Sequence, residues 1–323
     1  MPTIGKVSRV KIPASTANLG PGFDTLGMAL SLYAWIEMKP SEHTVFHLYG
    51  EQLEGVPGDK SNLIYQVAQQ VFEAAGVTIP ELEISMYSDI PLTRGLGSSA
   101  SAIVGALAAA NALIGSPLSD AKLFDMATSI EDHPDNVGAS LYGGIVTAIW
   151  DGQHADCIRL EPDVNLEALV VIPHFQLSTS KARQVLPSEF GMKDTVYNIS
   201  HSSLLVAALA TGQLDKVAAA MKDRVHQPYR AALVPGMTEV LEDAHKHGAL
   251  GAALSGAGPT LLVLADRRSD RKAELENYVT SKMQEAGIES TVMWLRPERN
   301  GVKVYNGEDV LPFLDMIKGE TES

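Results

Sequence analysis

The chain has 323 residues, of which 45% are hydrophobic and 20% charged, and its formal net charge is −14. This length predicts about two domains with ample core, and the negative charge argues against nucleic acid and anionic membranes as partners. Cys157 is the only cysteine, which excludes an internal disulfide and a multi-cysteine metal site. Because the sequence shows neither a signal pattern nor an apolar run of membrane length, it predicts a cytoplasmic protein.

The first predicted strand spans residues 6–13 and leads into a stretch of small residues, 14–24. Within this stretch, residues 20–22 read Gly-Pro-Gly and force a tight turn. Asn18 and Asp24 flank the turn, and two interpretations of them stay open. Either both side chains point into one cleft, or they cap the turn, as Asn and Asp commonly do.

Three further elements precede the central loop. Residues 29–39 and 44–50 are predicted to form paired strands around a polar turn. Residues 62–75 repeat apolar residues at helical spacing, which predicts a helix whose apolar stripe belongs to the core. Residues 82–88 alternate apolar and polar side chains and predict a half-buried strand.

Residues 91–113 carry the strongest functional signal, because here a glycine loop joins a strand to a helix of small apolar residues. Gly95 and Gly97 allow backbone conformations and close approaches that a Cβ would forbid. The helix start, where free N–H groups and the helix dipole favour an anion, also carries the hydroxyls of Ser98, Ser99 and Ser101. A phosphate fits this pattern better than other common ligands.

Other interpretations of this loop can be compared on the sequence. A P-loop needs a Gly-Lys-Ser/Thr end, and no lysine occurs between positions 60 and 122. A serine-hydrolase elbow needs a second glycine, which residues 97–101 lack. Residues 95–100 fit a relaxed dinucleotide-binding fingerprint, but that fold needs a strand after the helix, whereas residues 118–131 predict another helix. A purely structural glycine N-cap is the remaining alternative.

A second polar stretch, residues 131–136, follows that helix and reads Glu-Asp-His-Pro-Asp-Asn. Glu131 and Asp135 offer carboxylate oxygens, which suit Mg²⁺ held together with phosphate oxygens. His133 has no second histidine at ligand spacing, so it is interpreted as a hydrogen-bonding residue rather than a metal ligand.

A domain boundary is predicted between residues 161 and 162, after a hairpin formed by residues 143–150 and 156–161. Beyond it, the predicted strands are residues 168–173, 250–254, 261–264 and 291–295. The predicted helices are residues 194–211, 213–224, 237–247 and 268–286, with an irregular link over 228–235. This order matches a split βαβ, or ferredoxin-like, layout. The tail, residues 301–323, is predicted to hold a short strand and a helix.

Three stretches resemble the three ordered motifs of the GHMP small-molecule kinases: residues 10–24, 91–100 and 255–260. Within that family, the form of residues 18–24, 133–136 and 178–183 most resembles the homoserine kinases. The resemblance implies an α+β fold of two domains with the active site between them. Residues 1–161 would form an ATP-binding domain with a left-handed βαβ crossover, against the general right-handed rule, and residues 162–323 a ferredoxin-like domain.

The resemblance also implies roles for individual residues. The ATP phosphates would lie on the loop formed by Pro91, Leu92, Arg94, Gly95, Leu96, Gly97, Ser98, Ser99, Ala100 and Ser101. The amino-acid substrate would lie among Asn18, Asp24, His133, Asn136, Thr179, Arg183, Arg230 and Gly256. Asn62 would lie near the adenine. Ser99 (alternatively Ser98) and Glu131 would hold Mg²⁺, with Asp132 or Asp135 as substitutes for Glu131, and Ser99, Glu131 and Asn136 form the implied catalytic set.

The implied reaction moves the γ-phosphoryl group of ATP to the hydroxyl of L-homoserine, a step of threonine biosynthesis, in a homodimer. An amino acid needs a carboxylate for its ammonium, for which Asp24 is the candidate, and forked cations for its carboxylate, for which Arg183 and Arg230 are suited. Asp135 or Asp24 could act as a base, and neither is assigned. Arg94 either contacts phosphate or braces the loop. The competing functions are a kinase of another small alcohol and a non-catalytic ligand sensor.

Overall fold

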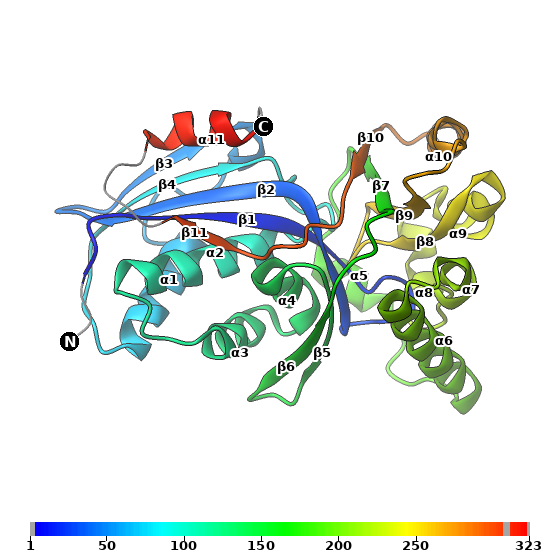
Figure 1. Cartoon of the computed structure of the whole chain (residues 1–323), viewed down its shortest axis with the longest axis horizontal. Helices are drawn as coiled ribbons and strands as arrows, with labels where there is room; N and C mark the ends of the chain where they lie inside the picture. Colours follow the sequence, from blue (N-terminus) through cyan, green and yellow to red (C-terminus); the bar gives the residue numbers. More distant parts are fainter. Residues whose placement is uncertain (1–3, 306–310, 322–323) are drawn as a thin grey trace.

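The computed structural model describes residues 4–305 and 311–321. Figure 1 shows two sheets side by side, each covered by helices. Among the described residues the first sheet has seven strands in the order β11-β1-β2-β4-β3, with the β5–β6 hairpin attached to β2. These strands are β1 (Ser8–Ala17), β2 (Leu26–Pro40), β3 (Val45–Tyr49), β4 (Leu82–Ser88), β5 (Ile145–Trp150), β6 (Ala155–Leu160) and β11 (Lys303–Tyr305).

Helices pack on one face of this sheet, below it in Figure 1: α1 (Leu63–Ala74), α2 (Ser98–Leu113), α3 (Asp120–Glu131) and α4 (Pro134–Tyr142). The small residues of α2 let it lie directly on the strands, since a Cβ at Gly105 would come within 2.7 Å of both Ile12 and Ile36. On the other face, α11 (Phe313–Thr321) packs Phe313 against Trp35 of β2. Both faces of the sheet are therefore covered, which explains why β1 and β2 are largely buried, including polar residues such as Ser15 and Thr16.

The second sheet has the order β10-β7-β9-β8, and all its neighbouring strands are antiparallel. Its strands are β7 (Leu166–Pro173), β8 (Ala249–Leu254), β9 (Leu261–Asp266) and β10 (Ser290–Leu295). The helices α6 (Met192–Thr211) and α7 (Val217–Ala220) pack on one face, and α9 (Met237–Asp243) and α10 (Lys272–Glu285) on the other. This arrangement confirms the ferredoxin-like layout and the α+β fold class.

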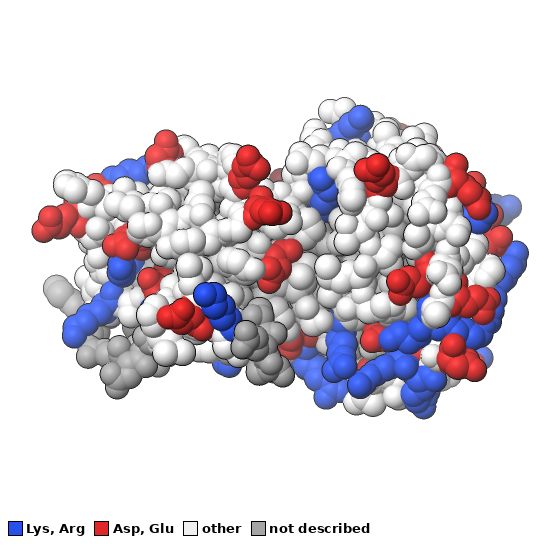
Figure 2. Space-filling model, turned by 90° about the horizontal axis from the view of Figure 1, so that it is seen from above, with Lys and Arg blue, Asp and Glu red and all other residues white. Residues whose placement is uncertain are grey.

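One of the buried apolar clusters joins the two sheets. Leu26, Met28 and Leu30 of β2 belong to the same buried cluster as Ala168 and Val170 of β7. Figure 2 shows Asp and Glu spread over the whole visible face, whereas Lys and Arg gather mainly on the half built on the second sheet. No helix in the described part of the chain combines the length and apolar character needed to cross a membrane.

The predicted pairing of residues 29–39 with residues 44–50 is wrong. β4 lies between the corresponding strands, antiparallel to β2, while β3 pairs with β4 in parallel. The reason is burial: β4 buries Leu82 and Ile84, whereas β3 is largely half-buried and takes the edge. β3, α1 and β4 thus form a βαβ unit, whose handedness stays a prediction.

Three local predictions also need correction. β1 continues to Ala17, beyond the predicted end of the strand at residue 13. The helix expected over residues 213–224 stops at Ala220. There the carboxylate of Asp223 accepts the backbone N–H groups of residues 225, 226 and 227, which forms a turn in place of the helix. Residues 134–142, not predicted as a helix, form α4 with Pro134 in its first turn.

The link over residues 228–235 is more regular than expected, because it contains α8 (Gln227–Arg230) and a 3₁₀ turn, Ala231–Leu233. The tail also departs from the simple division of the chain. β11 pairs with β1, so the chain returns to the first sheet after completing the second. The boundary between residues 161 and 162 stays a prediction, and the predicted tail residues 306–310, 322 and 323 lie outside the described part of the chain.

Candidate active site

A cleft lies between the two domains, and it brings together most of the residues singled out in the sequence. Its walls come from the turn after β1, the loop before α2, the α3–α4 junction, α5 (Thr179–Gln184), α8 and residues 256–258. The predicted site residues that line it are Asn18, Asp24, Gly95, Gly97, Ser98, Ser99, Glu131, His133, Asn136, Thr179, Arg183, Arg230 and Gly256.

The glycine loop is fixed by close backbone approaches. Gly97 is the N-cap of α2 with φ 69°, and a Cβ there would lie 2.1 Å from the Oγ of Ser15. Gly95 has φ 79°, and a Cβ there would lie 2.4 Å from the carbonyl oxygen of Ser255. The hydroxyl of Ser255 in turn donates to the carbonyl of Gly95 over 2.6 Å. The three motif stretches therefore interlock, and both glycines are required by the backbone.

Ser99 and Glu131 meet at the rim of the cleft. The Oγ of Ser99 donates to Oε2 of Glu131 over 2.9 Å, which joins the first turn of α2 to the last residue of α3. Burial raises the pKa of Glu131, although the positive charge of His133 and the hydrogen bond from Ser99 act against this rise. Glu131 thus reaches the loop directly from the helix end, and its role as a metal ligand, with Asp132 or Asp135 as substitutes, stays a prediction.

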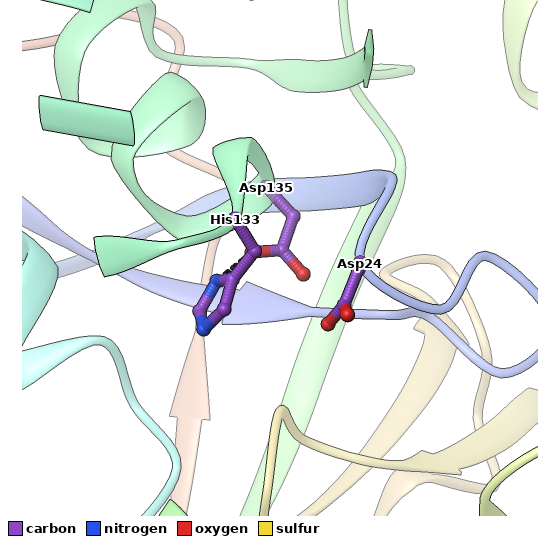
Figure 3. A group of neighbouring side chains, drawn as sticks. All are labelled: Asp24, His133 and Asp135. Carbon is purple, nitrogen blue, oxygen red and sulfur yellow. Dashed lines mark hydrogen bonds and ion pairs between the residues drawn. The ribbon is translucent and has the colours of Figure 1, made fainter. Parts of the chain in front are cut away.

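His133, Asp135 and Asp24 form an ionic cluster beside this pair, shown in Figure 3. Nδ1 of His133 lies 2.9 Å from Oδ1 of Asp135, the hydrogen-bonding place expected for this histidine. Burial lowers the pKa of His133, but the hydrogen bond to Asp135 and the charges of Asp135, Asp24 and Glu131 outweigh it and raise the pKa to about 9. A protonated His133 therefore balances part of the negative charge of Asp24 and Asp135.

The opposite wall carries two arginines. Arg183 binds both carboxylate oxygens of Asp24, over 2.8 and 3.0 Å. Arg230 is buried, donating from Nε to the carbonyl of Ala182 and from Nη1 to that of Gly256. Both guanidinium groups lie over the ring of Phe23, 5.4 and 5.3 Å from its centre. Burial and the charge of Arg183 lower the pKa of Arg230 to about 10, so Arg230 is charged at neutral pH.

The side chain of Asn18 fits both interpretations left open by the sequence, because it caps the turn and also reaches the wall of the cleft. Its Oδ1 accepts the backbone N–H of Asp24 over 3.0 Å, which caps the turn. Its Nδ2 donates to the carbonyl of Gly256 over 2.9 Å at the wall of the cleft. Asn136 lies nearby and accepts a hydrogen bond from the hydroxyl of Ser15.

Some predicted residues have other contacts. Asn62 caps α1, accepting the N–H of Ile64 and donating to the carbonyl of Pro57, so its place near adenine stays a prediction. Arg94 donates to the carbonyls of Leu92 and His174, which favours the bracing interpretation. Three members of the phosphate loop are buried beneath it and support its shape: Leu96, Ala100 and Ser101.

The sequence did not single out Phe23, Asn198 or His226, although all three contact the site. Phe23 lines the cleft, and His226 stacks on its ring. Asn198 and His226 donate to the carbonyls of the Gly20–Gly22 turn. Phe23 lies within the motif stretch 10–24 and could have been noticed. Asn198 lies in a stretch predicted as plain helix, and His226 lies between a predicted helix and the irregular link, where no motif marks it.

Comparison with known proteins agrees with these features. Residues 62–144 match the family model "GHMP kinases N terminal domain" and residues 205–284 match "GHMP kinases C terminal". The chain is 46% identical to a homoserine kinase of Deinococcus radiodurans, over 88% of this chain and 92% of that protein. It is 42% identical to one of Moorella thermoacetica, over 91% and 99%. The crystal structure of homoserine kinase from Cytophaga hutchinsonii superposes with a TM-score of 0.84 at 27% identity, covering 94% of this chain and 99% of that one.

Proposed function

This chain belongs to the homoserine kinases of the GHMP kinase family, and we propose that it transfers the γ-phosphoryl group of ATP to the side-chain hydroxyl of L-homoserine. One observation carries the proposal: a single cleft joins a phosphate-type glycine loop to Asp24, Arg183 and Arg230. Mevalonate and shikimate, substrates of the competing small-alcohol kinases, lack an ammonium group. Asp24 paired with two arginines therefore favours an amino acid over them.

The phosphates of ATP would bind residues 95–99. A helix N-terminus offers free N–H groups and the positive end of the helix dipole, and α2 begins in this loop. The positive φ of Gly95 and Gly97 lets the loop lie against Ser255 and Ser15, where a Cβ at either glycine would clash. The hydroxyl of Ser98, which also lines the cleft, is available as a further donor.

Ser99 and Glu131 fit a Mg²⁺ ion. A hydroxyl and a carboxylate oxygen, already 2.9 Å apart beside the phosphate loop, are the hard oxygen donors that Mg²⁺ accepts together with phosphate oxygens. A half-buried carboxylate with a raised pKa is also better satisfied by a cation than by a hydroxyl alone. When bound there, Mg²⁺ would neutralise charge that develops on the transferred phosphoryl group.

L-Homoserine would bind by exchanging ion pairs. Asp24 and Arg183 are bound to each other in a bidentate pair. A zwitterion can enter without leaving either charge alone, because its carboxylate takes Arg183 while its ammonium takes Asp24. Arg230 would meet the same carboxylate from the buried side, and Thr179 and Asn136 lie on the wall beside them.

The remaining catalytic task is positioning. Phosphoryl transfer passes through a loose transition state, so alignment of the hydroxyl and neutralisation of charge supply most of the rate. His133 would contribute positive charge beside the reacting groups. Asp135 already accepts from His133 and from the N–H of Asn136, and Asp24 is bound to Arg183. Neither carboxylate is assigned as a base.

A substrate panel tests the proposal. ADP release is measured with ATP and Mg²⁺ and, in turn, L-homoserine, D-homoserine, L-serine, L-threonine, mevalonate and shikimate, with a chelator as the metal control. Turnover with L-homoserine alone is expected. Turnover only with an acceptor that lacks an ammonium group would contradict the amino-acid site, and ATP binding without any turnover would indicate a sensor.

The family resemblance further supports a homodimer in the cytoplasm that acts in threonine biosynthesis. Light scattering at several concentrations would measure the oligomeric state directly, with a mass of one chain, 34.5 kDa, as the result against it.

A further inference from the structure

Two side chains of the second domain hold the Gly20–Gly22 turn of the first. Nε2 of His226 donates to the carbonyl of Gly20 over 2.7 Å. Nδ2 of Asn198, on α6, donates to the carbonyl of Pro21 over 3.0 Å, and its Oδ1 accepts the backbone N–H of Arg224. Both side chains are buried, so each bond is made away from water and is costly to lose.

His226 differs from Asn198 because it also contacts the site. Its Nδ1 lies 3.2 Å from Nη1 of Arg230. A guanidinium can only donate and a backbone carbonyl can only accept. Therefore Nδ1 must accept from Arg230 while Nε2–H donates to Gly20, and the imidazole is neutral with its proton on Nε2. Burial and the charge of Arg230 lower the pKa of His226, although Asp223, 3.6 Å away, acts against this.

The same ring also positions Phe23. The centres of the two rings are 5.2 Å apart, and Phe23 in turn carries both arginines on its face. Arg230 has its Nε bound to the carbonyl of Ala182 and shares Nη1 between Gly256 and His226. The position of the guanidinium is thus set by three hydrogen-bond partners, and His226 is the partner that is also hydrogen-bonded to the Gly20–Gly22 turn before Asp24.

We propose that His226 is a positioning residue. By hydrogen bonding to both Arg230 and the Gly20–Gly22 turn, it fixes their relative position, so that the carboxylate and the ammonium of the amino-acid substrate are bound at the same time. This inference rests on the proposed function, since it assigns Arg230 to the substrate carboxylate and Asp24 to the ammonium. His226 itself does not line the cleft among the described residues and takes no part in the chemistry.

Three substitutions separate its contacts. His226→Phe keeps a ring against Phe23 and removes both hydrogen bonds, and we expect the KM for L-homoserine to rise on the order of tenfold or more. The KM for ATP should stay close to that of the wild type. His226→Asn can restore an acceptor towards Arg230, whereas His226→Gln can restore a donor towards Gly20. We expect the Asn variant to recover more of the homoserine KM than the Gln variant.

Asn198→Ala is the matched control, because it removes a buried bond to the same turn without touching Arg230. It should lower the thermal unfolding midpoint but raise the homoserine KM less than His226→Phe does. An equal rise in both variants, or equal changes in the KM for ATP and homoserine, would overturn the inference. If His226→Phe does not fold, the homoserine KM values of His226→Asn and His226→Gln test the inference, and a lower KM in the Gln variant than in the Asn variant would overturn it.

A measurement without substrate separates this inference from the proposed function. Histidine ¹⁵N spectra of the wild type at pH 7, assigned by the signal lost in His226→Asn, should show a neutral ring with the proton on Nε2. A charged ring, or a proton on Nδ1, would overturn the inference. A wild type that does not phosphorylate L-homoserine would instead contradict the proposed function, and the spectra would still test the register of Arg230.

Discussion

The two halves of the cleft are built in different ways. The phosphate half is one continuous loop, residues 95–99, whose shape depends on two glycines with positive φ and the start of α2. The amino-acid half is assembled from side chains that are far apart in the chain, since Asp24 and Arg183 are separated by 159 positions. One half presents mainly backbone, and the other presents charges.

Because of this difference, the two halves lose function through different kinds of substitution. Backbone N–H groups cannot be removed by truncating side chains, so the phosphate half is sensitive to added atoms. A charged pocket has the opposite weakness, because each truncation leaves a partner charge unmatched. Adding a Cβ to the glycine loop should therefore affect ATP, and removing the charge of Asp24, Arg183 or Arg230 should affect the amino acid.

Glu131→Gln should give the largest effect, because Glu131 is the carboxylate that Ser99 contacts beside the phosphate loop. Without its charge, a fall in kcat on the order of 10³ is expected, and high Mg²⁺ should rescue part of it. Burial disfavours the charged form of Glu131, so the fold should not be destabilised by the change. Steady-state kinetics and thermal unfolding measure the two effects separately.

The control is Asp132→Asn, at the exposed neighbouring position, which has φ 68°, a conformation that Asn tolerates well. It should behave like the wild type. Near-normal activity of Glu131→Gln would contradict a metal-binding role for Glu131.

Gly97→Ala should have the second largest effect. It tests the claim that the phosphate half loses function when side-chain atoms are added to the loop. The new Cβ would lie 2.1 Å from Oγ of Ser15 at a φ of 69°, so both the loop and β1 must shift. A loss in kcat/KM for ATP on the order of 10² is expected, which corresponds to about 2.7 kcal/mol. Gly58→Ala is the matched control, because nothing lies within 4 Å of its Cβ. A normal KM for ATP in Gly97→Ala would break the comparison.

The same difference explains which parts of the site were visible in the sequence. The needs of the glycine loop are local, namely positive φ and a helix start, so Gly95, Gly97 and Ser99 could be interpreted from one stretch. The bonds from His226 to Gly20 and from Asn198 to Pro21 join residues 206 and 177 positions apart. No motif or sequence spacing around His226 or Asn198 predicts these contacts.

The fold shows the same limit, because local elements could be predicted from the sequence and long-range strand pairing could not. Strand and helix positions follow from hydrophobic periodicity, and the ferredoxin-like layout of the second domain was predicted from the order of these elements along the chain. Pairing was not, because β4 enters between β2 and β3 after an intervening helix. The return of β11 to β1 was equally invisible, since three residues of strand carry too little pattern to name their partner. Long-range pairing is decided by burial in the whole molecule.

Arg183→Ala should have the third largest effect. It tests the claim that the amino-acid half loses function when a charged side chain is removed. It removes the bidentate partner of Asp24 and exposes the substrate carboxylate to that negative charge. Since Arg183 is 38% exposed, solvent screens part of the loss, and a rise in the KM for L-homoserine of about tenfold to thirtyfold is expected. Arg183→Lys should recover only part, because lysine lacks the fork. An equal rise in the KM for ATP would contradict the role.

Arg94→Ala should have the smallest effect, although Arg94 is the one arginine within the phosphate loop and so sharpens the comparison most. Its guanidinium donates to the carbonyls of Leu92 and His174, and it does not line the cleft. If the phosphate half works through backbone, the KM for ATP should stay close to the wild-type value. The free energy of unfolding should fall by about 1 kcal/mol, because two carbonyls lose their donor. A tenfold rise in the KM for ATP without loss of stability would show that this half, too, depends on a charged side chain.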